Sequence, residues 1–202
     1  MVVLNIAAGK FAPLPLDSKE NIMMPKYILN VDTSYFSETK ADDAERDSEM
    51  WEQDPDRISR SAFINMDVFE FMERTRILFD RVVIYRFLEH VTFTQVEYFM
   101  YLVSTVLKKG GMVDVIVPNY NQLAEMILND HNKIGSAEFT PHNIVLTTEL
   151  LNEPSCPHAS IWTPDRMKYF WELECRFKHK VSWPAFKFDG RDIYLRSLIE
   201  RV

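Results

Sequence analysis

The strongest constraint on the fold is a strand–helix–strand pattern in the middle of the chain. The run FDRVVIYRF, residues 79–87, has the uninterrupted apolar centre of a strand buried on both faces. Apolar residues then recur at three- and four-residue steps from Thr94 to Leu107, which predicts a helix that begins with Thr94 as N-cap and stops at the Lys-Lys-Gly-Gly run of 108–111. The run MVDVIVP, residues 112–118, predicts the next strand. Strands joined in this way are parallel neighbours in a sheet covered by helices on both faces.

Short elements extend this pattern in both directions. Before the crossover, apolar runs predict three more strands, at residues 2–6, 26–32 and 62–67. After it, the pattern predicts two helices at 122–129 and 163–177, and two final strands at 178–183 and 192–200 that could form an antiparallel edge. Thr163 followed by Pro164 is a strong start signal for the second of these helices. We therefore expect one α/β domain over residues 1–202 with about seven strands, divided into a ligand-binding core (1–120) and a C-terminal part (121–202).

Composition and charge exclude several classes of protein. A chain of 202 residues that is 47% hydrophobic can bury the core of a single domain. The net charge of -7 resides in residues 38–56, which hold nine acids and two bases, and this segment is either a solvated surface or an acidic lid or docking surface. Because the remainder is balanced, no basic face for general nucleic-acid binding is expected.

The two cysteines, Cys156 and Cys175, lie outside any metal-ligand spacing, so we expect neither a disulfide framework nor a metal site. The sequence has no apolar run long enough to span a membrane and no secretory signal at its start, which predicts a cytoplasmic protein.

Residues suited to ligand binding follow the predicted strands. In a parallel sheet, ligands bind at the carboxyl ends of the strands. The first strand is followed by Ala7-Ala8-Gly9, where small side chains let a ligand approach the backbone. The second ends in Asp32, whose carboxylate could accept both hydroxyls of a ribose, and the third ends in Asp67, which could accept from an exocyclic amine such as that of adenine. The fourth runs into the segment from Tyr85 to His90.

Taken in chain order, the strands and strand-end residues from 3 to 120 resemble those of the class I S-adenosylmethionine-dependent methyltransferases. LNIAAGK looks like the first motif of that family, ILNVD like the second and INMDVFEF like the third. FDRVVIYRFLEHV resembles the fourth strand with its Leu-Glu-His signature, and LKKGGMVDVIVPN resembles the segment before and through the fifth strand. KFAPLPL is similar to a subgroup in which a short loop that contains proline replaces the first helix.

The resemblance implies a Rossmann-like methyltransferase fold and S-adenosylmethionine as the cofactor. By this resemblance, Ala7, Ala8 and Gly9 would line its methionine part, Asp32 with Thr33 its ribose, Asp67 with Val68 its adenine, and Tyr85 with Arg86 the methyl-transfer site. Glu89, His90 and His158 are candidate bases for an acceptor that must lose a proton. The acceptor would be a small molecule or an exposed group of a macromolecule, and the chain could work as a homo-oligomer or in a larger assembly.

Two other interpretations remain open. The family's first turn usually has two or three glycines, whereas here Gly9 stands alone. A methyltransferase-like domain without catalysis, serving as a structural or interaction module in a larger assembly, is therefore the alternative. A nicotinamide dehydrogenase ranks below both, because the three-glycine fingerprint after the first strand is missing. The aromatic residues near the second C-terminal helix are predicted to be core, except that Trp162 could cover the mouth of the substrate site.

Overall fold

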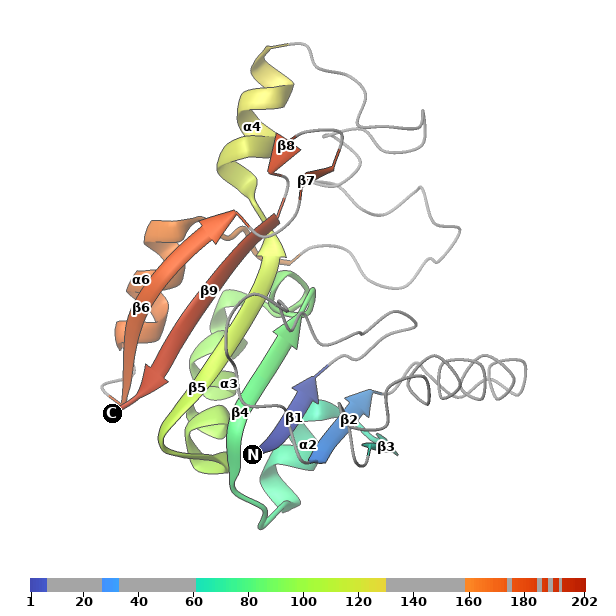
Figure 1. Cartoon of the computed structure of the whole chain (residues 1–202). Coiled ribbons are helices and arrows are strands. Elements are labelled where there is room, and N and C mark those ends of the chain that lie inside the picture. The colour runs from blue at the N-terminus through green and yellow to red at the C-terminus, as the bar shows by residue number, and fades with distance from the viewer. Residues whose placement is uncertain are drawn as a thin grey trace, which may run out of the picture.

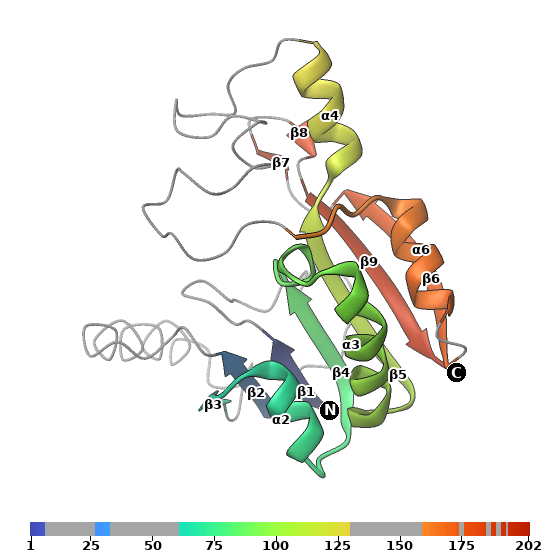
Figure 2. The same ribbon diagram turned by 180° about the vertical axis from the view of Figure 1, so that it is seen from behind.

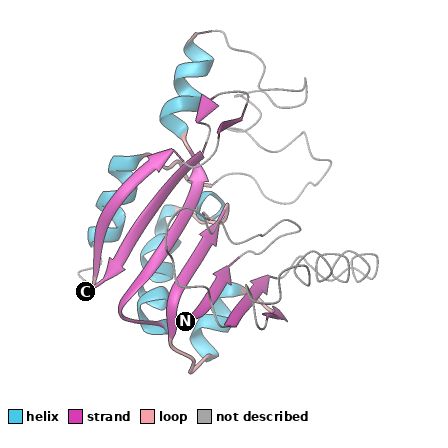
Figure 3. Ribbon diagram, viewed as in Figure 1, coloured by secondary structure: helices cyan, strands magenta, loops and turns pink. Residues whose placement is uncertain are grey.

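The computed structural model has a seven-stranded sheet at its centre, with the strand order β3-β2-β1-β4-β5-β9-β6 (Figures 1 and 3). It describes residues 1–6, 27–32, 61–129, 159–173, 176–184, 187–188, 191–192 and 194–202. The strands of the sheet are β1 (Val2–Ile6), β2 (Tyr27–Asp32), β3 (Ser61–Asn65), β4 (Phe79–Tyr85), β5 (Leu107–Pro118), β6 (Phe177–Pro184) and β9 (Tyr194–Arg201). A small separate sheet joins β7 (Lys187–Phe188) to β8 (Arg191–Asp192).

The first five strands of the sheet are parallel, as the crossover pattern predicts. Strand β9 is antiparallel to both of its neighbours, β5 and β6. The prediction of two final strands that pair in antiparallel fashion is therefore confirmed. Their order differs from the order in the chain, because β9 lies between β5 and β6 and leaves β6 at the edge.

Three helices pack against one face of the sheet: α2 (Val68–Arg74), α3 (Phe93–Val106) and α6 (Pro164–Leu173) (Figure 2). The main core lies between these helices and the sheet. Its buried members include Val82 and Ile84 of β4, Phe99 and Val103 of α3, and Trp171 of α6. Burial of each such side chain contributes roughly 1.5–3 kcal/mol to stability. Helices on the second face remain a prediction that the described residues do not test.

The central helix α3 begins earlier than expected. Its N-cap is Thr92, so the prediction of Thr94 is wrong. The Gln95 side chain accepts hydrogen bonds from Thr92 N at 3.3 Å and from Thr92 Oγ1 at 2.7 Å. Phe93 is thereby the first helical residue, and its ring stacks on that of Phe170 at 5.1 Å between centroids. Contact with α6 thus extends the first turn of α3 to Phe93, which the apolar periodicity of the sequence does not include.

The end of α3 is also a correction. The helix stops at Val106 and Leu107 is already extended, so the glycines do not cap it. Leu107 is fully buried and pairs with Phe79 as the first residue of β5. The register then shifts before the next pair, Arg81 with Met112. Gly110, which lies between these two pairs, has φ of 75°, a left-handed conformation that glycine adopts without strain.

The other predicted helices agree better with the structure. Helix α6 begins as expected, since Thr163 Oγ1 accepts from Arg166 N at 3.2 Å. Helix α4 (Tyr120–Leu128) starts directly after β5 and projects beyond the carboxyl edge of the sheet (Figure 1). Its N-cap is Asn119. A short 3-10 turn, η2 (Leu88–His90), lies between β4 and α3.

Three charged side chains are buried on the sheet face opposite the main core. Asp114 of β5 is 1% exposed, Arg81 of β4 is 7% exposed and Arg196 of β9 is 3% exposed. Asp114 accepts from Arg196 at both oxygens, Nε to Oδ1 at 2.8 Å and Nη2 to Oδ2 at 2.7 Å, and Arg81 also donates to Oδ2. Because successive residues of a strand alternate between faces, Asp114 points away from the core that Val113 and Val115 enter. One carboxylate thus ties three strands together.

We predict that Asp114→Asn lowers the free energy of unfolding by about 3–5 kcal/mol, because it removes the negative charge that two buried guanidinium groups bind. Urea denaturation measures the loss. Glu70→Gln is the control, since Glu70 forms an exposed pair with Arg74 on α2 and its loss should cost under about 0.5 kcal/mol. Equal stability of the Asp114 variant and the wild-type protein would contradict this view of the triad.

Candidate functional site

The carboxyl ends of the parallel strands lie together along one edge of the sheet (Figure 1). The register aligns Ile6 of β1 with Val31 of β2 and with Ile84 of β4. Asp32 at the end of β2 is opposite Asn65 at the end of β3. The predicted strand-end residues that the structure describes therefore share this edge, as expected from parallel strands.

Four predicted residues lie outside the described residues. They are Ala7, Ala8, Gly9 and Thr33, and the candidate base His158 falls there as well. Their roles stay predictions from the sequence. Asp32 is described, and it is the half-buried last residue of β2.

Asp67 lies at the edge but already has a structural function. It is exposed and is the N-cap of α2, where its Oδ1 accepts from Phe69 N at 2.9 Å and from Glu70 N at 3.1 Å. Among the described residues none donates to Oδ2, so that oxygen is the one available for an adenine amine. Val68, the other predicted adenine contact, is buried in the main core. The cap was missed because the apolar residues around Asp67 were interpreted as the end of a strand only.

The chain turns sharply where β4 ends. Arg86 has φ of 52°, which is unusual for a residue with a side chain and costs roughly 1–2 kcal/mol. Its backbone N–H donates to Ile116 O of β5 at 2.8 Å. Its guanidinium lies over the ring of Tyr194, 5.7 Å from the centroid. This geometry sends residues 86–90 across the edge towards β5 and β9.

Glu89, the next residue of interest in this turn, is fully buried. Its side chain is 0% exposed, and neither carboxyl oxygen has a hydrogen-bond partner among the described residues. Loss of solvation raises the pKa of Glu89 to about 8, while the nearby backbone N–H of Glu89 itself and the charge of Arg86 oppose the rise. Unpartnered buried carboxyls are rare in folded proteins and call for an explanation.

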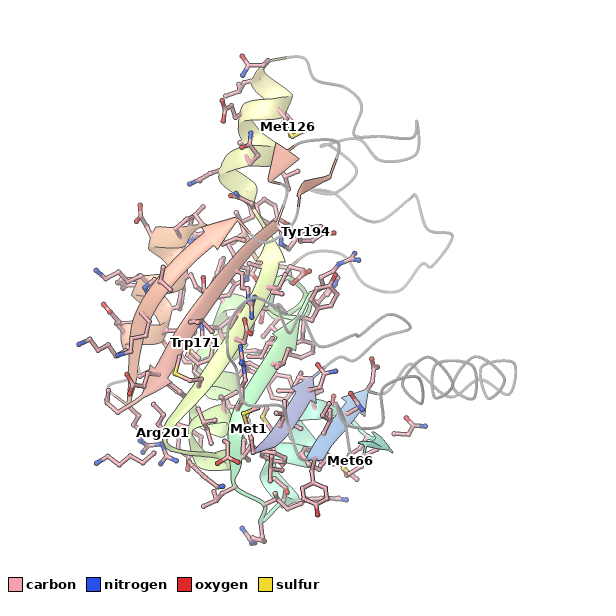
Figure 4. The ribbon with its side chains drawn as sticks, in the orientation of Figure 1. Met1, Met66, Met126, Trp171, Tyr194 and Arg201 are labelled. Carbon is pink, nitrogen blue, oxygen red and sulfur yellow. The ribbon has the colours of Figure 1, made fainter. Side chains whose placement is uncertain are left out.

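The charge of Glu89 also acts on two tyrosines from other elements. Tyr120 is the first residue of α4, and burial together with the nearby charge of Glu89 raises its pKa well above the ordinary value. Tyr194 is the first residue of β9 and pairs with Pro118 at the end of β5 (Figure 4). Burial raises its pKa, Arg86 opposes the rise, and Tyr85 and Glu89 add to it. Both phenols therefore stay neutral at physiological pH.

A segment distant in sequence holds the Glu89 turn in place. Ala159 N and Ser160 N both donate to Glu89 O, at 2.7 and 3.0 Å. Ser160 Oγ donates to Leu88 O at 2.7 Å, and Trp162 Nε1 donates to that same hydroxyl at 2.8 Å. The sequence offers no signal for this contact, because residues 159–162 have no periodicity.

Trp162 does not cover a substrate mouth, so this prediction is wrong. Its side chain is 0% exposed and belongs to the main core. The indole contacts the rings of Phe93 and Phe170, with centroids 5.8 and 5.6 Å away. Trp162 thus acts on the site indirectly, through Ser160.

His90 is partly buried beside Glu89, and its backbone N–H donates to Phe87 O at 2.9 Å. Its role as a base stays a prediction. Within the described residues, no group of three or more His, Cys, Asp or Glu side chains could hold a metal ion. No helix in the described part of the chain is long and apolar enough to cross a membrane.

No protein-family model matches the sequence, and no curated protein matches it significantly. Solved structures do match it. DhpI in complex with SAH has a TM-score of 0.60 at 14% identity, over 99% of this chain and 76% of that chain. The chain has the Rossmann-like methyltransferase fold. An S-adenosylmethionine-dependent methyltransferase from Methanosarcina mazei has a TM-score of 0.59 at 16% identity, over 100% of this chain and 92% of its own.

A third neighbour, magnesium protoporphyrin IX methyltransferase (ChlM) from Synechocystis PCC 6803 with bound SAH, matches with a TM-score of 0.59 at 8% identity, over 99% of this chain and 74% of that chain. The fold predicted from the order of the strand-end motifs is thus confirmed. It holds across nearly the whole chain, including the C-terminal part that the motifs do not cover.

We predict that the stability of the wild-type protein falls more steeply with pH than that of Glu89→Gln. Below about pH 4.5 the Glu89 carboxyl is protonated in both the folded and the unfolded state. Between that pH and about 8 only the folded state holds the proton, so the free energy of unfolding falls as pH rises. The full shift corresponds to about 5 kcal/mol.

Urea denaturation at pH 5, 6, 7 and 8 tests this, with the exposed Glu97 of α3 changed to Gln as the matched control. The wild-type protein and the control should lose stability in parallel, while Glu89→Gln should lose several kcal/mol less over the same interval. Three parallel curves would show that Glu89 titrates as an ordinary carboxyl.

Proposed function

We propose that this protein is an S-adenosylmethionine-dependent methyltransferase. The observation that carries the proposal is the match of nearly the whole chain to methyltransferase structures, two of which contain SAH. The motif order of the sequence supports it independently, since it resembles the same family from residue 3 to residue 120. One of these neighbours is named for a tetrapyrrole, magnesium protoporphyrin IX. The shared fold by itself does not identify the acceptor of this chain.

The residues at the carboxyl edge fit such a cofactor. The half-buried Asp32 carboxylate at the end of β2 suits the two hydroxyls of a ribose. Asp67 would use Oδ2 for the adenine amine, because its Oδ1 already caps α2. Ala7, Ala8 and Gly9 are proposed for the methionine part on the resemblance alone. When bound, the cofactor supplies an electrophilic methyl group on a positively charged sulfur.

Methyl transfer is an in-line displacement, so the main tasks of the protein are to align the acceptor and to exclude water. In this chain the turn from Tyr85 to His90 is the part of the edge best suited to these tasks. It is rigid, because Ala159 and Ser160 bind its backbone, and it places a fully buried acid next to the ends of β4 and β5.

A module without catalysis is the weaker candidate. A buried carboxyl with no partner costs several kcal/mol of stability, and a domain that binds no ligand gains nothing in return. Glu89 therefore argues for a site that is still in use.

We predict that SAH binds the purified protein and that Asp32→Asn weakens this binding by about 10- to 100-fold. Hydrogen bonds to a charged acceptor contribute roughly 1.5–3 kcal/mol. Isothermal titration calorimetry measures the dissociation constant. Asp165→Asn, an exposed acid in the first turn of α6, is the matched control and should bind as the wild-type protein does. Absence of binding at millimolar SAH, with ATP and NADH equally inert, would overturn the proposed function.

A further inference from the structure

Arg86 lies on the part of the carboxyl edge that the proposed ribose and adenine contacts leave open. Those contacts, Asp32 and Asp67, follow β2 and β3, on one side of β1 in the strand order. Arg86 follows β4, on the other side of β1. Its exposed guanidinium lies over the ring of Tyr194, which starts β9 at this edge (Figure 4). An acceptor bound beside the cofactor would therefore meet Arg86.

The guanidinium of Arg86 has no hydrogen-bond acceptor among the described residues, although it carries five N–H donors in one plane. The other arginines whose side chains are described mostly donate to a carboxylate, a hydroxyl or a backbone carbonyl: Arg74, Arg81, Arg166, Arg176, Arg196 and Arg201. Arg76 is the remaining exception in this group, and it is exposed between α2 and β4, at the opposite edge of the sheet. At the carboxyl edge, Arg86 thus keeps its donors available for a ligand.

The position of Arg86 is fixed at both ends of the residue. Its backbone N–H donates to Ile116 O at 2.8 Å, and its φ of 52° is a conformation that the surrounding structure has to enforce. Its guanidinium is 5.7 Å from the centroid of the Tyr194 ring. A guanidinium over an aromatic face keeps its in-plane donors free for hydrogen bonds. The side chain is therefore placed in advance for a planar acceptor of hydrogen bonds.

The charge at this part of the edge favours an anion. Glu89 is the acid nearest to Arg86 in the chain, but burial raises its pKa to about 8, so it carries little negative charge at pH 7. The sulfonium of the proposed cofactor would add a second positive charge. Like charges repel, and a negative group on the acceptor removes that repulsion. Carboxylates and phosphates also match the planar donors of a guanidinium with two hydrogen bonds.

Resting on the proposed function, we propose that the methyl acceptor carries an oxyanion, either a carboxylate or a phosphate group, which the Arg86 guanidinium binds beside the ring of Tyr194. An uncharged acceptor would leave the guanidinium without a counter-charge, and an ammonium group would add a further positive charge. Arg86 is in this view a binding residue that selects the acceptor, and it takes no part in proton transfer.

The test compares anions with uncharged molecules of nearly the same shape. Phenylacetate against phenylacetamide and dimethyl phosphate against trimethyl phosphate are titrated into the wild-type protein saturated with SAH, at pH 7 and constant ionic strength. We expect at least one anion to bind about 10-fold or more tightly than its uncharged analogue, as measured by calorimetry. The pair that shows the preference tells carboxylate from phosphate. Added salt should reduce the preference, because it screens an exposed charge.

Substitution of Arg86 should remove the preference. In Arg86→Gln the anion and its uncharged analogue should bind with dissociation constants within about 2-fold of each other. Arg76→Gln is the matched control, since Arg76 is also exposed and without an acceptor, and it should keep the wild-type preference. Glycine adopts a φ of 52° without strain, so Arg86→Gly is a second variant that should fold and still lose the preference.

The cofactor has a carboxylate of its own, so a further comparison separates it from the acceptor. SAH and 5′-methylthioadenosine, which lacks the carboxylate and the amino group, are titrated into the wild-type protein and Arg86→Gln. The ratio of their two dissociation constants should be the same in both proteins. A ratio that falls about 10-fold in Arg86→Gln would show that Arg86 binds the cofactor and would overturn the inference.

Three further results would each contradict an anionic acceptor bound by Arg86. They are equal binding of anions and uncharged analogues, a preference that Arg86→Gln keeps or Arg76→Gln also loses, and no binding of any anion at about 20 mM.

The SAH titration separates this inference from the function on which it rests. If SAH binds and no anion is preferred, the methyltransferase proposal stands and the anionic acceptor is wrong. If SAH does not bind, the same pairs are titrated into the protein alone. A preference that depends on Arg86 would then show an anion site in a protein that is not a methyltransferase.

Discussion

The ion triad around Asp114 is the constraint on which the arrangement of the site depends. Asp114 binds both donor groups of Arg196, and this pairing holds β9 antiparallel to β5 in one register. In that register Tyr194, at the start of β9, is opposite Pro118, at the end of β5. An antiparallel strand thus brings its first residue to the edge where the parallel strands end. Without it, the Tyr194 ring would not lie beneath the Arg86 guanidinium at this edge.

The turn after β4 contains two features that lower the stability of the fold. Arg86 adopts a strained conformation, and the buried Glu89 carboxyl has no hydrogen-bond partner within the part of the chain that the structure describes. Both features cost free energy, which the surrounding structure must supply. The backbone bonds from Ala159 and Ser160, and the fully buried Trp162 behind them, provide that support. A ligand that satisfies Glu89 would therefore also stabilise the folded protein.

Sequence reasoning was accurate where local pattern and burial agree. Buried runs such as that around Val82 predicted the parallel strands, and Thr163 with Pro164 predicted the start of α6, because apolar periodicity and capping chemistry act over a few residues. It was wrong where a distant contact decided the outcome. Phe93 is part of α3 because it packs on Phe170. Gly110 lies in an irregular part of β5 and does not cap the helix, because buried Leu107 already pairs with Phe79.

The sequence by itself determined the class of fold and the edge of the sheet at which the candidate ligand-binding residues gather, because strand-end residues of parallel strands must share one edge. It also pointed to Glu89 and Arg86 as neighbours of the site. The tertiary structure alone decided that no described residue donates to the buried Glu89 carboxyl and that Arg86 lies over the ring of Tyr194. Solvation and charge depend on all the elements that meet at a point, and those elements are up to about a hundred residues apart in this chain.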